Sequence, residues 1–246
     1  MRRSRSKSPS ARAAANPGAW RRWALLRTSC GGWSEPRRAP VLRLLVCAAL
    51  AGCTPAPAVP APARCPSDAV VIASQADVAQ LARCATLRGV TIRSGGALDT
   101  SALRALTTIT GDLVIGPTVG VEDVTLGELR VVEGAVHVVG NGLLQGLFLP
   151  RLERAGRFVV DGNVAITTLS LPRLTAVHGA LRVTENASLE LVDIPALATI
   201  DGELVLIGNP KLTLVESGEL GSVGRVELAA PRLAAELVDR LRSLVQ

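Results

Sequence analysis

Aromatic side chains are nearly missing from this sequence. Its 246 residues include no tyrosine, two phenylalanines and three tryptophans, and the last tryptophan is Trp33. Proteins that bind single-stranded nucleic acid stack the bases on aromatic rings. The formal net charge of +6 would favour a nucleic-acid partner, but the shortage of rings argues against one. We therefore expect no nucleic acid among the partners.

Histidine is also scarce, and the chain has only two, His137 and His178. Catalytic triads use a histidine beside their other members, and zinc sites cluster histidine or cysteine ligands. The two histidines fall at different positions of the repeat described below. No glycine-rich phosphate loop or nucleotide motif follows residue 52. We predict that the protein is not an enzyme and binds no metal and no cofactor.

Positive charge is concentrated near the N-terminus. Residues 1–52 hold 11 of the 27 basic residues and one acid, Glu35, whereas the remainder has 16 basic and 20 acidic residues, a net charge of −4. Arg43 precedes the short apolar run 44–50, which small residues follow. This order is typical of a secretory signal peptide, and the run is too short to span a bilayer.

The tetrad Leu50-Ala51-Gly52-Cys53 ends this leader and resembles the lipobox of bacterial lipoproteins. The resemblance implies that residues 1–52 are removed and that acyl chains on Cys53 anchor the protein in the membrane. An ordinary signal peptide cleaved nearby is the alternative. By resemblance to lipoprotein sorting rules, Thr54 in place of aspartate favours the outer membrane over the inner membrane.

Residues 1–40 show no apolar periodicity and predict no fold. We weigh three interpretations of them. The first is an arginine-rich arm that binds nucleic acid. The second is a twin-arginine export signal around Arg21 and Arg22. The third is that these residues are not translated, because translation starts near Val41 or Leu42.

Residues 53–64 join the lipid site to the folded part and are rich in proline and alanine. Alternating prolines favour an extended polyproline II conformation of about 3 Å per residue. We predict a semi-rigid spacer that holds a single folded domain, residues 65–246, away from the membrane.

The cysteines then have simple roles. Cys30 and Cys47 leave with the leader, and Cys53 carries lipid, so Cys65 and Cys84 are left. In an exported and oxidising compartment, we expect these two to form a disulfide.

A repeat of 22 or 23 residues fills the chain after Cys84. Its marker is a glycine, found at Gly89, Gly111, Gly134, Gly156, Gly179, Gly202 and Gly224. From the second glycine onward, apolar residues stand two and four positions later, at Leu113/Ile115, Val136/Val138, Phe158/Val160, Leu181/Val183, Leu204/Leu206 and Val226/Leu228. Such alternation is typical of a strand with one buried face.

Other positions share the same period. Asparagine stands seven residues after four of the glycines, and we predict that the four side chains stack as a ladder at a corner: Asn141, Asn163, Asn186 and Asn209. A second group of spaced leucines ends at a proline in three units, which marks another corner: Pro150, Pro172 and Pro195.

A unit of this length cannot bury its own apolar face, so the units must stack as a solenoid. The period suits a leucine-rich repeat or a parallel β-helix. Two β-type segments per unit, without a helical pattern between the glycines, favour the second. We therefore predict a mainly β fold, a parallel β-helix-like solenoid of about seven coils.

The open ends of a solenoid expose strand edges and need caps. Residues 74–77 are predicted to open a short helix that ends near Cys84, with Val78 and Leu81 on one face. At the other end, we predict that Pro231 opens a helix over residues 232–245. Its apolar stripe comprises Leu233, Leu237, Leu241 and Leu244.

Three segments resemble receptor L domains, the ligand-binding domains of insulin-receptor and epidermal-growth-factor-receptor type proteins, which also occur in bacterial surface lipoproteins. They are residues 81–92, 106–115 and 197–206, and the last two share an Ile-x-Gly-x-Leu-x-(Ile/Leu) pattern. The resemblance covers residues 65–246 and implies a right-handed solenoid with a disulfide-linked helical cap. Val90 and Ile92 depart from the pattern by one residue, and Ala155 replaces the usual Ile or Val. No ligand-contact residue carries over.

One outward row of the predicted strands is the candidate interaction face: Val114, His137, Val159, Arg182 and Val205. Exposed valines on a flat sheet suggest a protein-binding patch, although β-branched residues also suit any strand. The neighbouring row alternates in charge and gathers no carboxylates for glycoside chemistry: Asp112, Ala135, Arg157, Ala180, Glu203 and Arg225.

These observations lead to one expected function. The protein is a lipid-anchored, non-enzymatic binding module of the bacterial envelope, whose solenoid surface takes a protein or glycan ligand. A structural envelope spacer without a specific ligand is the first alternative. A β-helix carbohydrate-active enzyme is the second and the less favoured.

Overall fold

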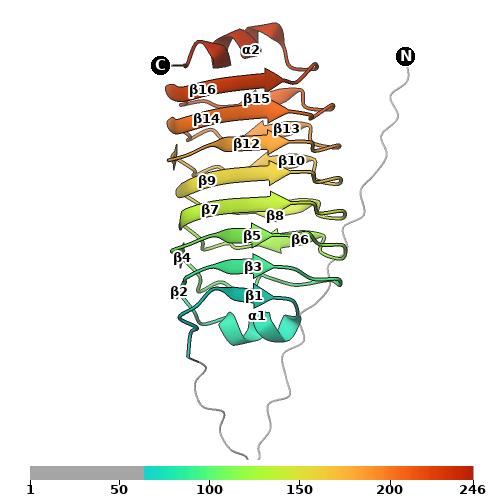
Figure 1. Ribbon diagram of the computed structural model, residues 1–246, viewed down its shortest axis with the longest axis vertical. Coiled ribbons are helices and arrows are strands. Elements are labelled where there is room, and N and C mark those ends of the chain that lie inside the picture. The colour runs from blue at the N-terminus through green and yellow to red at the C-terminus, as the bar shows by residue number, and fades with distance from the viewer. Residues whose placement is uncertain (1–63, 246) are drawn as a thin grey trace, which may run out of the picture. The chain divides into compact units, whose positions relative to one another are not determined.

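The structure is a computed structural model that describes residues 64–245. This part of the chain winds into stacked coils, as predicted, with a helix at each end (Figure 1). The larger sheet, sheet A, has eleven strands. They are β1 (Val70–Ile72), β2 (Thr86–Leu87), β3 (Val90–Ile92), β4 (Thr108–Ile109), β5 (Leu113–Ile115), β7 (Val131–Val139), β9 (Arg154–Asp161), β11 (Ala176–Val177), β12 (Leu181–Thr184), β14 (Thr199–Ile207) and β16 (Ser222–Ala229).

The second sheet, sheet B, has five strands in the order β15-β13-β10-β8-β6. Their bounds are β6 (Asp123–Thr125), β8 (Gly146–Phe148), β10 (Thr168–Ser170), β13 (Leu191–Asp193) and β15 (Leu214–Glu216). Strands in both sheets pair in parallel with the equivalent strand of the next coil. The predicted mainly β solenoid of about seven coils is therefore confirmed. Strand β1 adds a row before the first predicted coil, because Val70–Ile72 pairs with Val90–Ile92.

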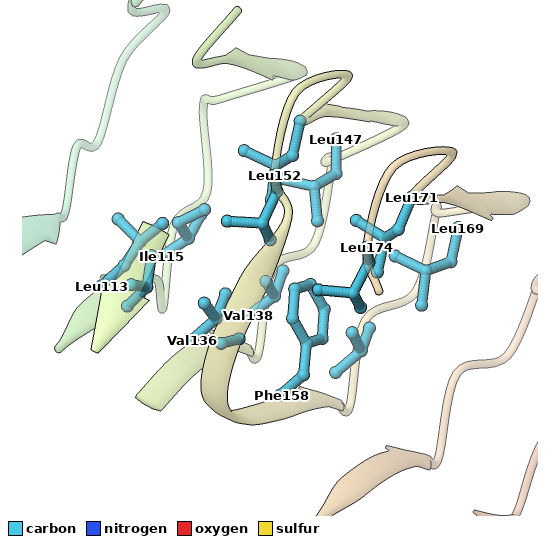
Figure 2. Close-up of a cluster of buried hydrophobic side chains, with 14 of the residues drawn as sticks. Leu113, Ile115, Val136, Val138, Leu147, Leu152, Phe158, Leu169, Leu171 and Leu174 are labelled. Carbon is cyan, nitrogen blue, oxygen red and sulfur yellow. The ribbon is translucent and has the colours of Figure 1, made fainter. Parts of the chain in front are cut away.

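The interior contains the alternating apolar residues that the repeat predicted. Phe158 and its neighbours on sheet A face leucines from sheet B and the proline corners across a continuous core (Figure 2). The first coil keeps this packing despite its shifted frame, since Val90 pairs with Leu113 and Ile92 with Ile115. In the last coil, Val226 and Leu228 are only partly buried, because no further coil covers them.

Coils of 22 and 23 residues stack together because the extra residue is absorbed at one place. Where β7 pairs with β9, the register shifts by one residue on β7, after Val132 and before Ala135. Where β14 pairs with β16, it shifts in the same way on β14, after Ile200 and before Glu203. In each case the longer coil carries one additional residue just before its glycine, which produces a β-bulge. The core positions on both sides of the bulge therefore stay aligned.

The predicted asparagine ladder is present, and its four members are fully buried. The Nδ2 group of each asparagine donates to Oδ1 of the next, at 2.9 Å from Asn141 to Asn163, 3.0 Å from Asn163 to Asn186 and 3.1 Å from Asn186 to Asn209. Each Oδ1 also accepts a backbone N–H of the preceding coil. The ladder thus satisfies polar groups that would otherwise be buried without partners.

Both caps are present, with one correction. Helix α1 (Gln75–Leu81) begins at a capping box of Ser74 and Asp77 and buries Val78 and Leu81. The N–H of Ala73, and then the hydroxyl and N–H of Ser74, lower the pKa of Asp77. The predicted Cys65–Cys84 disulfide is present and joins the segment before β1 to the turn that follows this helix.

The C-terminal helix is shorter than predicted. Helix α2 spans Ala235–Arg242, so Pro231 lies in a turn before it rather than in its first turn. The leucine stripe nevertheless covers the last coil, since Leu233 and Leu241 are buried and Leu237 and Leu244 pack against the core. Within residues 64–245, neither helix has the length and hydropathy that a membrane crossing requires.

The ladder predicts a large cost for one truncation. Asn163→Ala removes the side-chain partner of the Val138 carbonyl and of the Asn141 N–H, and it takes one of two acceptors from Nδ2 of Asn141. An unsatisfied buried polar group costs about 1–3 kcal/mol, so we expect the free energy of unfolding to fall by about 3 kcal/mol or more. Urea unfolding measures it, with the exposed neighbour Val164→Ala as control. Equal effects of the two substitutions would contradict a stabilising ladder.

Candidate functional site

The predicted interaction face forms a single row across sheet A. Val114, His137 and Val159 lie side by side in register on β5, β7 and β9, and Arg182 follows on β12. The first three side chains are half-buried and Arg182 is exposed. The row thus exists as predicted, and it also extends to Thr91 and the exposed Val71 at its N-terminal end.

Val205 does not belong to an exposed surface, and this part of the prediction is wrong. The residue lies in the same row, but only 1% of its surface is exposed. Its neighbours in register are Arg182 and Glu227. Arg182 also donates to Glu203, at 2.8 Å, two residues before Val205 on the same strand. We attribute the burial of Val205 to these long side chains, whose stems cover apolar surface.

Some of the charges on sheet A pair with each other. Besides the Arg182–Glu203 pair, Arg225 lies 3.8 Å from Glu227. Asp112, at the other end of the face, accepts the N–H of Ala135 at 2.7 Å. Among the described residues, the exposed Glu133, Arg154 and Arg157 of the same sheet form no ion pair, so this face keeps charges of both signs.

The two histidines do not form a site together. His137 lies within β7, whereas the exposed His178 follows β11 on another coil. Nδ1 of His178 is 3.1 Å from Oδ2 of Asp201. No group of three His, Cys, Asp or Glu side chains within residues 64–245 is arranged to hold a metal ion.

Sheet B has a surface that the sequence interpretation missed. On β8, Leu147 points into the core and Phe148 points outward, with 52% of its surface exposed. Phe148 is one of only two aromatic residues after residue 52. The alternation Leu147-Phe148-Leu149 carries the signal, because the inward leucines force the ring between them to the outside.

A groove of about 280 Å³ surrounds this ring. Its other walls are mostly apolar or hydroxylated side chains of the neighbouring coils: Gln145, Leu147, Leu149, Pro150, Thr168, Ser170 and Pro172. Gly146 is essential to its shape, because a Cβ at this position would overlap both the Phe148 ring edge and Oδ1 of Asp123. The ring therefore lies back over the strand, and the Asp123 carboxylate ends next to it.

A second hollow, of about 510 Å³, lies beside the β6 end of sheet B. Its walls include three carboxylates, those of Asp99, Glu122 and Asp123. Hydrogen bonding by Ser101, through its hydroxyl and then its N–H, lowers the pKa of Asp99. This carboxylate therefore stays ionised at neutral pH.

The charge on sheet B is of one sign. Its five strands contain no lysine or arginine, and acidic residues stand in or just before them: Glu122, Asp123, Glu190, Asp193 and Glu216. Within residues 64–245, none of these five carboxylates forms an ion pair. The nearest arginines in sequence, Arg151 and Arg173, come after the corner prolines, and Arg151 pairs with Glu128.

The predicted lipidation site Cys53 and nearly all of the predicted spacer lie outside the described residues. We compared the chain with protein-family models, curated proteins and solved structures, and none of them matches it. The receptor L-domain resemblance therefore stays a prediction.

Truncation of the two phenylalanines should lower the stability by very different amounts. Phe158 is fully buried, so Phe158→Ala should lower the free energy of unfolding by about 3–5 kcal/mol. Phe148 lies on the surface, and Phe148→Ala should lower it by less than about 1 kcal/mol. Urea unfolding of both variants tests this contrast. A large loss for Phe148→Ala would show that the ring serves stability rather than the surface.

Proposed function

We propose that this protein is a lipid-anchored binding module of the bacterial envelope, and that it acts without catalysis by presenting the face of its solenoid to a ligand. The observation that carries the proposal is the groove around Phe148. An aromatic ring that is half exposed, on a flat face of regularly stacked strands, contributes little to the core and offers a large contact area to a partner.

Three further features support this function. The tetrad ending at Cys53 supplies an anchor, and the proline-rich segment after it supplies a spacer of about 30 Å. The Cys65–Cys84 disulfide suits an oxidising compartment. Among the described residues, the carboxylates of sheet B form no ion pair, which leaves them for an external partner.

Anchoring predicts a specific modification. When the full chain is expressed in a bacterium supplied with labelled palmitate, Cys53 should carry the label and the protein should fractionate with membranes, the outer membrane in a two-membrane host. Cys53→Ser should abolish both, whereas Cys47→Ser should change neither. Equal labelling of the Cys53→Ser chain would disprove the lipid anchor.

Ligand capture should depend on sheet B. We expect a photo-crosslinking residue at Thr168, in the groove, to yield a defined adduct in intact cells, and Phe148→Ala to abolish it. The substitution Val164→Ala, at another exposed residue, serves as the control and should leave the adduct unchanged. A second probe at Arg157 on sheet A, combined with Val159→Lys, tests the row predicted from the sequence.

Each result of this experiment has a meaning. An adduct only from position 157, lost in Val159→Lys, would move the binding surface to sheet A. No adduct from either face would favour the structural spacer. Turnover of a polysaccharide by the purified protein would revive the carbohydrate-active enzyme.

A further inference from the structure

We propose that the groove on sheet B binds an extended, basic segment of a polypeptide, in which two Lys or Arg residues flank one apolar residue in the pattern basic-x-apolar-x-basic. This inference rests on the proposed function and adds the chemistry of the ligand. It follows from the sign of the charge, from the apolar floor of the groove and from the spacing of the strands.

The negative charge beside the groove favours a positively charged ligand. Asp123 lies next to the groove on the β6 side, where its carboxylate is close to the groove residue Gly146 and to the edge of the Phe148 ring. On the opposite side, the groove residue Ser170 donates to Oδ2 of Asp193, at 2.7 Å. Glu122 and Glu190 precede the same two strands and are exposed. Because no strand of sheet B carries a basic residue, these carboxylates attract cations and repel acidic glycans, nucleic acids and anionic lipids.

The apolar floor of the groove favours an apolar residue in the ligand, between its two basic residues. Strands β8 and β10 carry no charged residue, and Phe148, Pro150 and Pro172 supply the apolar contact surface. An aliphatic side chain of a ligand would be removed from water there, which contributes about 25 cal/mol for each Å² of apolar surface buried.

The spacing of the strands selects an extended chain. Asp123 on β6 and Asp193 on β13 are three strand steps apart and two residues apart in register, a distance of about 16 Å at the usual strand separation and rise per residue. The long side chains of two Lys or Arg residues can make up part of this distance. Four residues of extended polypeptide span about 13 Å. Residues i, i+2 and i+4 of such a chain point to the same side. The two basic residues thus reach the two carboxylate groups while the middle residue reaches the ring.

A polyamine shares the charge but not the other features. It has no side chain to place in the groove of about 280 Å³, and it does not fill the adjoining hollow of about 510 Å³. A polypeptide fills both, since its flanking residues continue past Asp123 toward Glu122 and Asp99.

The test measures the binding of fluorescein-labelled nonapeptides to the full chain by fluorescence anisotropy. The probe has the central sequence Lys-Thr-Leu-Thr-Lys, and a second peptide has the same composition with the lysines adjacent, Lys-Lys-Leu-Thr-Thr. We expect the first to bind at least tenfold more tightly, and its affinity to fall as salt rises because the contacts are electrostatic. Equal affinities of the two peptides would overturn the spacing.

Matched variants locate the binding surface. Glu122→Gln combined with Asp123→Asn should weaken binding at least tenfold, whereas Glu133→Gln combined with Glu227→Gln removes the same charge from sheet A and should leave it unchanged. Phe148→Ala should weaken binding and Val164→Ala should not. Gly146→Ala keeps every charge and the ring but displaces them, and it should also weaken binding. Urea unfolding checks that each variant is folded.

The remaining outcomes separate the inference from the proposed function. If spermidine competes as well as unlabelled peptide, the ligand is a polyamine and the inference is wrong. If the peptides fail to bind while crosslinking in cells still requires Phe148, the binding function stands and only the proposed ligand falls. If the peptides do not bind and no crosslinking in cells requires Phe148, both the proposed ligand and the binding function are wrong.

Discussion

The whole solenoid depends on a hydrogen bond between identical side chains at one corner of the coil. An asparagine amide buried without a partner is costly, but it is satisfied when the same residue occupies the same corner of the next coil. Asn141, Asn163, Asn186 and Asn209 meet this condition and also bind the backbone of neighbouring coils. The residue before each is in the left-handed region, as Gly140, Gly162, Glu185 and Gly208, which turns the chain from sheet A toward sheet B. A coil displaced by one residue would leave both the amides and the core unmatched.

This regular stacking explains why the two sheets present different surfaces. Parallel, in-register pairing turns each position of the repeat into a row of side chains about 4.8 Å apart, so a row with one sign of charge accumulates charge and a mixed row neutralises itself. On sheet A, Arg182 pairs with Glu203 of the neighbouring row, and these two charges neutralise each other. On sheet B, the rows contain only acidic or neutral residues, and Phe148 interrupts them.

Much of the fold could be predicted from the sequence because its signals repeat. The glycine period, the asparagine corner, the cysteine pair and the helix start at residues 74–77 each indicated a feature that is present. Features that occur once were harder to predict. Strand β1 has no preceding glycine, and the start of α2 shifted because the turn after Pro231 takes up several residues. The burial of Val205 depends on the conformations of Arg182 and Glu227, which no pattern of alternation contains. The outward position of Phe148 could have been inferred from its two leucine neighbours, but its groove requires Gly146 on the same strand.

The bulge ahead of the glycine has a consequence for how such a chain changes over generations. It accepts one extra residue, at Glu133 or Asp201, without moving the core. Elsewhere in the coil, an inserted residue would rotate every following strand by one position and bury its outward side chains. Among descendants of this gene, single-residue insertions and deletions should therefore survive at the bulge and be eliminated from the rest of the coil. Larger changes should survive when they add or remove a whole coil, because each coil contacts only its two neighbours.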